Sequence, residues 1–299
     1  TGAATEGSPT HLVRSSDGSL YGTTDSLGLS LGTMFRLAPD DTFSQIATSF
    51  SDGPADGAIP TAALLEGADG NFYGTTSAGG TFGLGTIFKL TRDGSMSLLH
   101  NFAGGADGAL PYAALIQATD GNFYGTTYYG GGSANLGTIF QMSADGAVTI
   151  VYRFAGGTEG AHPYAPLIQA ADGSLYGTAV GFCRLQGCQD EAAGTGGTIF
   201  QMTLGGAVTT VRRLDANAEG VHPYAALVQG TDGNFYGSTT QGQNDILPRF
   251  NLDGTIFRMT FPSYSATYKI PAPSIATASG LLKVALVSAP SKSERIPAF

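Results

Sequence analysis

Short apolar runs separated by Asp-Gly pairs follow one another along most of this chain. In one clear copy, the apolar runs span residues 113–118, 122–127, 137–142 and 147–154. The pairs Asp120-Gly121 and Asp145-Gly146 join these runs, and Asp-Gly accepts the positive φ of a tight hairpin. The fourth run is rich in β-branched and aromatic residues, which favour strands. The copy therefore predicts four antiparallel strands, and no stretch shows the 3.6-residue period of an amphipathic helix.

The chain carries five such copies. Their Tyr-Gly pairs begin at Tyr21, Tyr73, Tyr124, Tyr176 and Tyr236, at intervals of 52, 51, 52 and 60 residues. A fixed period of this size indicates a repeat protein, and four antiparallel strands per repeat describe a β-propeller blade. The sequence predicts an all-β, five-bladed β-propeller with four antiparallel strands per blade and a C-terminal extended arm. A linear β-solenoid is the alternative, although its coils are usually shorter and lack paired Asp-Gly hairpins.

The repeat also predicts the domain organisation. One propeller domain is expected over residues 1–270, with blades at about 6–55, 56–106, 107–158, 159–218 and 219–270. Most of the repeated Tyr-Gly, Gly-Thr and Asp-Gly pairs are expected to be structural, with the glycine after each tyrosine allowing close backbone approach between blades.

Residues 271–299 are expected to form a Pro-containing arm with one apolar strand. The apolar positions of this strand are Leu281, Leu282, Val284, Leu286 and Val287. A strand this apolar must be covered, or it becomes an association site. Three alternatives stay open for this strand. It completes blade five or seals the ring, it adds to the sheet of a neighbouring protomer, or it leads into a further segment.

Composition narrows the class of protein. Glycine supplies 45 of 299 residues and charged residues only 12%, which favours turns over long helices, while 42% hydrophobic residues suffice for a large core. The net charge of −9 argues against nucleic acid or an anionic membrane as partner. No apolar run is long enough to span a bilayer. The first residues lack a signal-peptide pattern, as expected of a mature chain whose leader has been removed.

The motif Asp-Gly-Asn-Phe-Tyr-Gly-Thr-Thr followed by Gly-Thr-Ile-Phe resembles the GloVer-type tandem repeat of bacterial secreted and surface proteins. The resemblance covers most of the chain, although a hydrophobic C-terminal sorting helix is lacking. It implies an extracellular or cell-surface location in a bacterium and a repeat architecture, but no particular reaction.

Two cysteines, Cys183 and Cys188, lie close together in one loop insertion. Their spacing favours a loop-stapling disulfide, which would agree with an oxidising, extracytoplasmic setting. A metal pair is the weaker alternative because no second Cys or His pair completes a tetrahedral site, and the spacing differs from that of a redox motif.

Each connection into a new repeat carries an acidic residue, then glycine, then proline. The acids are Glu6, Asp56, Asp107, Glu159 and Glu219. If they ring one mouth of a central channel, they would favour a bound cation such as calcium, the one cofactor that the sequence suggests. Alternatively, each acid caps its own turn by accepting backbone N–H groups.

The loops between the second and third strands vary in length and carry aromatic residues. These are Phe82, Tyr128, Tyr129, Phe182 and Phe250. Variable loops on a rigid frame are common binding sites, and exposed aromatic rings can stack on sugars, although packing beneath the loops is an equal alternative. His162 and His222 share one repeat position before proline, without a Ser or Cys nucleophile motif beside them.

The first functional hypothesis is a non-enzymatic extracellular structural protein that self-associates, into a homo-oligomer or filament, through its C-terminal strand. The alternative is a carbohydrate-binding, lectin-like propeller that holds a glycan on the variable-loop face. The third is a hydrolase or lyase acting on polysaccharides, for which paired carboxylates could come from different blades.

Overall fold

The computed structural model describes residues 9–24, 31–47, 50, 56–181, 195–215, 220–240 and 254–260. The chain divides into two compact units, Thr1–Ser263 and Tyr264–Phe299, and every described residue belongs to the first. The arm predicted over 271–299, with its apolar strand, lies outside the described residues. In the described part the fold consists of strands and one short 3-10 helix, η1 (Gly157–Glu159), which confirms an all-β fold. No helix there is long and apolar enough to cross a membrane.

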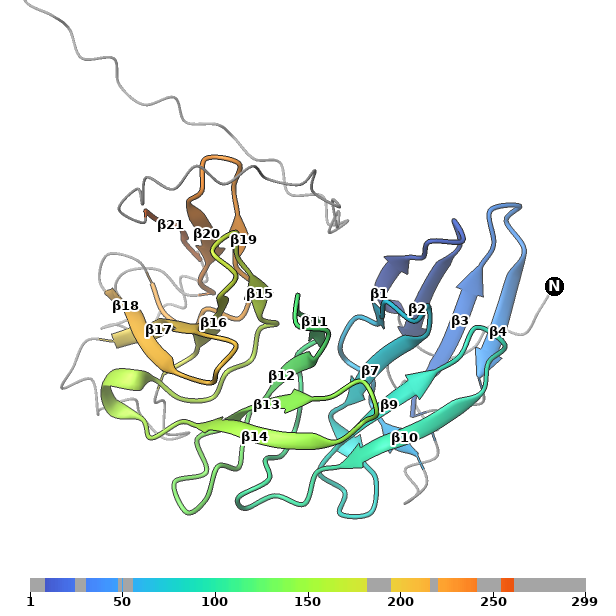
Figure 1. The fold of residues 1–299 in the computed structure, drawn as a ribbon, viewed down its shortest axis with the longest axis horizontal. Helices are drawn as coiled ribbons and strands as arrows, with labels where there is room; N and C mark the ends of the chain where they lie inside the picture. Colours follow the sequence, from blue (N-terminus) through green and yellow to red (C-terminus); the bar gives the residue numbers. More distant parts are fainter. Residues whose placement is uncertain are drawn as a thin grey trace, which may run out of the picture. The chain divides into compact units, whose positions relative to one another are not determined.

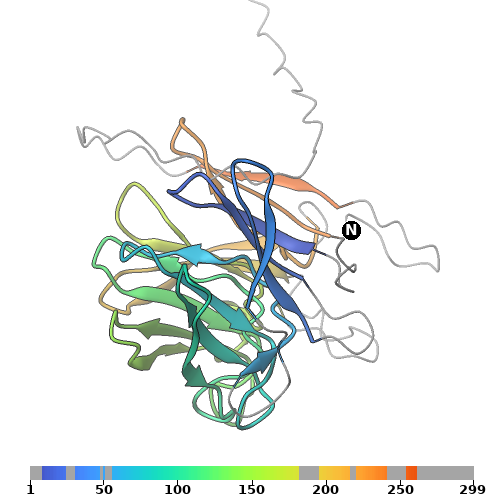
Figure 2. The same cartoon turned by 90° about the vertical axis from the view of Figure 1, so that its right-hand side faces the viewer.

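The strands form one antiparallel sheet per repeat, and each sheet follows chain order as a meander (Figures 1 and 2). Repeat one contains β1 (Pro9–Arg14), β2 (Leu20–Thr24), β3 (Thr33–Leu37) and β4 (Phe43–Ala47). Repeat two contains β6 (Leu65–Glu66), β7 (Phe72–Thr76), β9 (Thr86–Leu90) and β10 (Met96–Asn101), beside the separate pair β5 (Gly57–Ala58) and β8 (Ala78–Gly79).

The later repeats have the same order. Repeat three contains β11 (Ile116–Gln117), β12 (Phe123–Thr127), β13 (Thr138–Met142) and β14 (Val148–Arg153). Repeat four contains β15 (Ile168–Gln169), β16 (Leu175–Ala179), β17 (Thr195–Met202) and β18 (Val208–Asp215). Repeat five contributes three strands within the described residues: β19 (Val228–Gln229), β20 (Phe235–Ser238) and β21 (Ile256–Met259).

The first strand of the copy is shorter than predicted. Of the apolar run at 113–118, only β11 pairs with a neighbouring strand, and two-residue first strands recur in repeats two, four and five. Ala113 and Leu115 precede β11 and are each 2% exposed, so they pack in the core outside the ladder. Pro111, which cannot donate to a ladder, stands at the start of this run.

The Asp-Gly turns are closed by a tyrosine four residues further on. In repeat three, Asp120 accepts hydrogen bonds from the backbone N–H of Asn122 at 3.1 Å and from the hydroxyl of Tyr124 at 2.8 Å. The tyrosine-to-aspartate hydrogen bond recurs in all five repeats, at 2.7 to 3.1 Å. The Asp-Gly and Tyr-Gly motifs are therefore structural, and their polar groups are used within the repeat.

The glycine after each tyrosine makes room for a phenylalanine ring. A Cβ on Gly125 would lie 2.4 Å from Cζ of Phe140, its partner across β12 and β13, and the other four glycines have the same neighbour at 2.4 to 2.7 Å. The expectation that this glycine serves an approach between blades is therefore wrong. The contact lies within one repeat, where the ring fills the core.

Consecutive repeats pack sheet against sheet. The tyrosine of each Tyr-Gly pair lies on what we call the following face, which contacts the next repeat. Ring centroids lie 4.1 Å apart for Tyr21 and Phe72, and 4.3 Å apart for Tyr73 and Phe123. We call the side that receives this tyrosine the preceding face. The hydrophobic cores therefore lie between neighbouring repeats as well as within them.

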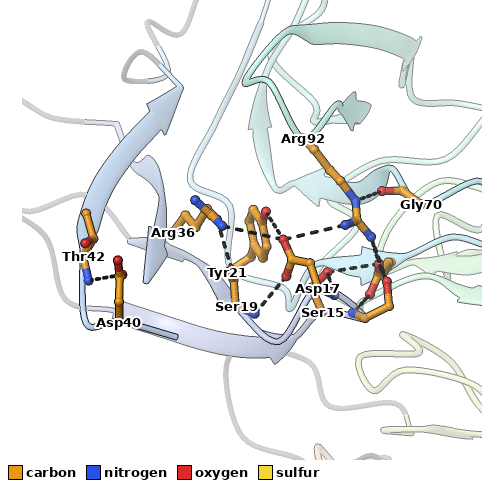
Figure 3. Close-up of polar contacts among 11 residues, drawn as sticks. Ser15, Asp17, Ser19, Tyr21, Arg36, Asp40, Thr42, Gly70 and Arg92 are labelled. Atoms are coloured by element: carbon orange, nitrogen blue, oxygen red, sulfur yellow. Dashed lines mark hydrogen bonds and ion pairs between the residues drawn. The ribbon is translucent and has the colours of Figure 1, made fainter. Parts of the chain in front are cut away.

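A side-chain carbonyl bridges each junction at the ends of the first two strands. Gln117 accepts the backbone N–H of Ala68 at 2.8 Å, and glutamines of repeats four and five accept the equivalent N–H groups at 2.9 Å. At the junction of repeats one and two, Glu66 takes the place of glutamine and accepts the N–H of Ser16 at 2.8 Å. Figure 3 shows the charged network there, in which Arg92 reaches Asp17.

The two terminal repeats each expose one apolar face. On the following face of repeat five, Val228 is 63% and Ile256 is 69% exposed, whereas the residues equivalent to Ile256 in the other four repeats are fully buried. On the preceding face of repeat one, Leu12 is 49% and Phe43 is 58% exposed. Leu64, equivalent to Leu12 in repeat two, is 5% exposed. The exposed faces are thus the ones that would continue the internal packing.

Candidate functional site

Six aromatic side chains from repeats three to five gather into one group, which we call the aromatic cluster. Its members are Tyr112, Tyr128, Tyr129, His162, Tyr164 and Tyr224. The ring of Tyr164 lies 5.1 Å from that of Tyr112 and 4.9 Å from that of Tyr224. Tyr128 contacts Tyr112 at 5.6 Å and stacks on His162 at 4.7 Å. All six side chains are half-buried, so they form a partly accessible aromatic surface.

The backbone that positions this cluster is repeated. His162 has φ of 54°, its N–H donates to the carbonyl of Leu136 at 2.7 Å, and its carbonyl accepts from Val180 at 3.4 Å. Leu110 has the same φ and is held by equivalent hydrogen bonds. The residue before proline has positive φ in four repeats: Ile59, Leu110, His162 and His222. Because apolar residues share this strained conformation, it belongs to the architecture and not to the histidines.

The proline after His162 packs closely on repeat three because the residue that it meets there is a glycine. Gly137 has φ of 97°, and a Cβ there would lie 2.5 Å from the carbonyl of Thr127 and 2.7 Å from Cδ of Pro163. Pro163 thus packs directly on the Gly-Thr motif of repeat three. This contact fixes the position of Tyr164, the next residue along the chain, against the loop that carries Tyr128.

The hydroxyl groups distinguish the cluster from the structural tyrosines. Tyr124 and its four equivalents donate to an aspartate of their own turn. Among the described residues, the hydroxyls of the five cluster tyrosines make no hydrogen bond. Two residues before Tyr128, Thr126 is 1% exposed and its hydroxyl also has no described partner, whereas Thr178 in repeat four donates to the carbonyl of Pro223 at 2.9 Å. The cluster therefore holds polar groups whose hydrogen-bonding capacity is unused.

The cluster is electrically neutral around pH 7. Burial, with smaller contributions from neighbouring tyrosines, raises the pKa of Tyr128 to about 12. Burial also raises the pKa of Tyr112 and that of Tyr224. Burial lowers the pKa of His162 below its usual value, although a hydrogen bond to the carbonyl of Tyr128 opposes this shift. These side chains can stack and exchange hydrogen bonds, but they offer no fixed charge to a ligand.

The acidic residues of the repeat connections are engaged locally where the structure describes their side-chain contacts. Asp107 accepts from His100 Nε2 at 3.0 Å and from the N–H of Ala103 at 2.9 Å. Glu159 accepts from the hydroxyl of Tyr152 at 2.6 Å and from a backbone N–H at 3.3 Å. Both acids therefore act as the capping alternative expects.

These contacts do not bring the acids of the repeat connections together as ligands of the predicted cation. In the described ranges, no three His, Cys, Asp or Glu side chains come together as metal ligands. The carbonyl of Asp56 accepts the N–H of Gly80 at 2.9 Å, which places its backbone in the connection to repeat two. Glu6 and Glu219 lie outside the described residues, so the calcium ring stays a prediction.

Of the predicted loop aromatics, the structure brings together Tyr128 and Tyr129. Phe82 is 57% exposed and has no ring contact with the cluster. Phe182 and Phe250 lie outside the described residues, as do Cys183 and Cys188, whose disulfide therefore has no support here and stays a prediction. The sequence analysis missed Tyr112, Tyr164 and Tyr224, each of which follows the proline of its repeat.

The sequence profile of the Gloeobacter/Verrucomicrobia repeat matches residues 8–183. None of the curated proteins matches this chain. Among solved structures, a protein from Bacteroides uniformis assigned as a 6-phosphogluconolactonase is 18% identical, with 77% of this chain and 64% of that chain covered and a TM-score of 0.50. A luciferin-regenerating enzyme is 11% identical, with 84% and 76% covered and a TM-score of 0.51. At these identities the likeness shows the fold, which is β-propeller-like.

The comparisons correct the first functional hypothesis. The sequence analysis expects a non-enzymatic protein that assembles through its C-terminal strand, yet the two solved structures described above are named as enzymes. The assembly strand lies outside the described residues, and no described contact supports a filament. The expectation failed because the repeat reveals only the scaffold, whereas side chains that form a site come from non-repeated positions that are distant in sequence.

Proposed function

This chain belongs to the Gloeobacter/Verrucomicrobia repeat family, and we propose that it is a β-propeller protein that binds an uncharged sugar on the aromatic cluster. The observation that carries the proposal is the set of tyrosine hydroxyls without described hydrogen-bond partners on stacked, half-buried rings. A sugar presents an apolar face, which packs on an aromatic ring, and hydroxyls, which exchange hydrogen bonds with tyrosine. The lack of fixed charge in the cluster favours a neutral ligand over an acidic one.

The composition of the cluster agrees with that of a small-molecule site. Such sites are mostly apolar, with a few polar groups that orient the ligand. Here the aromatic rings of Tyr128 and Tyr164 supply the apolar surface, and their hydroxyls supply the polar groups.

Isothermal titration calorimetry with a panel of uncharged mono- and disaccharides tests this proposal. We expect Tyr128→Ala and Tyr164→Ala each to raise the Kd by about 3- to 10-fold, because each removes one aromatic contact of about 1 kcal/mol. Phe82→Ala is the matched control, since that exposed ring lies on a variable loop without contacting the cluster. Equal affinities in all four proteins would place the sugar elsewhere, and no binding by the wild type would reject the proposal.

We further propose that the five repeats are the five blades of one ring, in which the preceding face of repeat one covers the following face of repeat five. Ring closure is supported by the residues on these two faces, which are equivalent to residues that pack against each other between the other repeats. Tyr236 is equivalent to the tyrosines that pack on the next repeat elsewhere, and Leu20 is equivalent to their partner Phe72. Closure would bury Ile256, which matches residues with no exposure in the other repeats.

The substitution Ile256→Asp tests ring closure. In a closed ring it buries a charge and should lower the free energy of unfolding by more than about 2 kcal/mol. On an exposed face the same change should fall within about 0.5 kcal/mol of wild type. Urea denaturation distinguishes the two, and the small effect would argue for an open array.

The remaining sequence predictions have direct tests. Mass spectrometry of the unreduced protein checks the bridge between Cys183 and Cys188. Melting with and without EDTA checks the calcium ring, because removal of a bound cation should lower the Tm. An extracellular location rests on the repeat family and on the cysteine pair, and fractionation of the producing cells would check it.

A further inference from the structure

An open groove of about 350 Å³ lies along β18 of repeat four. Its lining consists of Thr158, from η1 in the connection before this repeat, and of four consecutive residues of the strand, Thr210, Val211, Arg212 and Arg213. We propose that this groove binds an oxyanion, the group shared by carboxylates and phosphates, and that Arg213 recognises it. None of the lining residues belongs to the aromatic cluster, so the groove is a binding site in addition to the one proposed for sugar.

The Arg213 side chain is exposed and has one hydrogen bond to the described residues, from Nε to the carbonyl of Thr158 at 3.4 Å. This contact crosses the groove and leaves the N–H groups of both terminal nitrogens unused by described residues. Paired N–H groups of a guanidinium match the two oxygens of a carboxylate or phosphate. Arg212 donates from Nη1 to the carbonyl of Arg258 at 3.1 Å, so we assign the recognition to Arg213.

The lack of an ion pair distinguishes Arg213 from most basic residues of repeats one and two. Arg36, Lys89 and Arg92 each form an ion pair with an acidic side chain. Arg213 forms none with any residue that the structure describes. Acidic residues outnumber basic ones in this chain by 23 to 14, so a shortage of acids does not explain the difference. The positive charge of Arg213 can therefore serve a ligand.

The acidic residue next to the groove is engaged elsewhere. Glu159 follows Thr158 in η1, but its carboxylate accepts from the hydroxyl of Tyr152 at 2.6 Å and from the N–H of Ala155 at 3.3 Å. The carbonyl of Glu159 accepts from the hydroxyl of Thr198 at 2.9 Å. These contacts hold the connection in place and direct the carboxylate toward repeat three, where it forms no ion pair with an arginine of the described part.

The equivalent place in repeat three has the arginine without the polar lining. Arg153 pairs with Thr138 across the ladder as Arg213 pairs with Thr198. The other positions differ, since repeat three has Ala106, Ile150 and Tyr152 where the groove has Thr158, Thr210 and Arg212. Threonine hydroxyls can donate to an oxyanion, whereas alanine and isoleucine side chains cannot. The combination of an arginine with hydroxyl groups is therefore absent from repeat three.

Titration of the isotope-labelled protein with sodium phosphate and, separately, with sodium glucuronate tests the proposal. Sodium chloride keeps the ionic strength constant, and the amide NMR signals of residues 210–213 report binding. Because the chain has a net charge of −9, its overall field repels anions, so binding would reflect the groove itself. Phosphate represents a free oxyanion, and glucuronate represents one carried on a sugar. The tighter of the two identifies the source of the ligand.

We expect Arg213→Gln to raise the Kd of the tighter probe by about 10-fold or more, because a charged, paired contact is lost. Arg213→Lys keeps the charge but not the paired N–H groups, so its Kd should lie between those of wild type and Arg213→Gln. Arg153→Gln is the matched control. It removes the same charge from the equivalent exposed position outside the groove, and its Kd should stay within about 2-fold of wild type.

Spectra recorded without a probe check that the variants fold, which we expect because Arg213 and Arg153 are both exposed. Equal weakening by the two glutamine substitutions would overturn the proposal, since it would trace binding to the overall charge. An absence of shifts at residues 210–213 with both probes would overturn it as well. Neither result bears on sugar binding by the aromatic cluster.

Discussion

The junction between repeats one and two should open in acid before the other junctions do. At this junction Glu66 accepts hydrogen bonds from the Ser15 hydroxyl at 3.0 Å, from the Ser16 N–H and hydroxyl at 2.8 and 2.6 Å, and from Arg92 at 2.5 Å. Arg92 also donates to the carbonyl of Gly70 at 2.9 Å (Figure 3). At the other described junctions the same place is taken by Gln117, Gln169 and Gln229, whose amides do not titrate.

The direction of the pH effect follows from the pKa of Glu66. Burial alone would raise this pKa, but the hydrogen bonds from Ser16 and Ser15 and the charge of Arg92 outweigh burial and lower it. A carboxyl whose pKa is lowered by folding contributes stability above its unfolded pKa, and this contribution is lost as the pH falls through the folded value. Burial alone would also raise the pKa of Asp17, but hydrogen bonds from Ser19 and Tyr21 outweigh burial and lower it. The junction should therefore weaken below about pH 4.5.

The substitution Glu66→Gln isolates this effect because glutamine is the residue of the other junctions. Its side-chain oxygen can still accept the N–H of Ser16, and its amide can donate to the carbonyl of Gly70. The charge interaction with Arg92 is lost, and so are the hydrogen bonds that the other carboxylate oxygen accepts from Arg92 and from the Ser15 and Ser16 hydroxyls. Because Arg92 is 39% exposed, the cost at pH 7 should be about 1–2 kcal/mol. Below the lowered pKa of Glu66, where the wild-type carboxyl is protonated, the difference in stability that is due to this charge should disappear.

Amide hydrogen exchange at pH 7 and at a series of pH values below 4.5 provides the assay. In the wild type, the protection factor of the Ser16 amide should fall in acid more than those of Ala68, Thr119 and Ala171, which report on the other junctions. In Glu66→Gln the four amides should respond alike. Equal loss of protection at all four in the wild type would falsify the idea that charge makes this junction acid-sensitive.

Three further predictions concern the repeat itself. Gly125→Ala should lower the free energy of unfolding by about 1–3 kcal/mol, because its Cβ would lie 2.4 Å from Phe140, and urea denaturation should show a smaller loss for Gly205→Ala, whose Cβ would meet nothing closer than 3.7 Å. Tyr124→Phe should cost about 1–2 kcal/mol in the same assay, since its hydroxyl bonds Asp120 and Gln141, whereas Tyr112→Phe should cost less than about 0.5 kcal/mol. Gly137→Ala should destabilise more than Gly132→Ala, since only Gly137 lies against Pro163, and similar midpoints for the two would contradict that contact.

Regular features of the sequence predicted the regular features of the fold. Asp120-Gly121 indicated a hairpin, and the strands after it lie where the alternation placed them. The hydrogen bond from Tyr124 to Asp120 was not foreseen, because a period in the sequence does not reveal which polar groups meet. The positive φ of His162 also runs against expectation, since a following proline normally favours an extended conformation.

The candidate site was only half visible in the sequence. Tyr128 and Tyr129 stood out because they interrupt a variable loop. Tyr112 and Tyr164 did not stand out, because each follows the repeated proline of its repeat. A usable signal existed, since repeats one and two have threonine at that position, as in Pro60-Thr61, whereas repeats three to five have tyrosine. The sequence did not show that this loop meets the segments before the first strands of the two later repeats, which carry Tyr164 and Tyr224.

The position of the cluster follows from how the repeat uses its own polar groups. Motif residues such as Asp120 and Tyr124 satisfy each other, so the same residues in five copies are unavailable to a ligand. A site must then form where the copies differ, and one such difference is the change from Thr61 to a bulky, stackable tyrosine in the later repeats. The hydroxyl of Thr61 is buried without a described partner, so it has no reach toward solvent. Recognition should therefore be confined to the sector of repeats three to five, and replacing Thr61 by tyrosine should extend that surface by one ring.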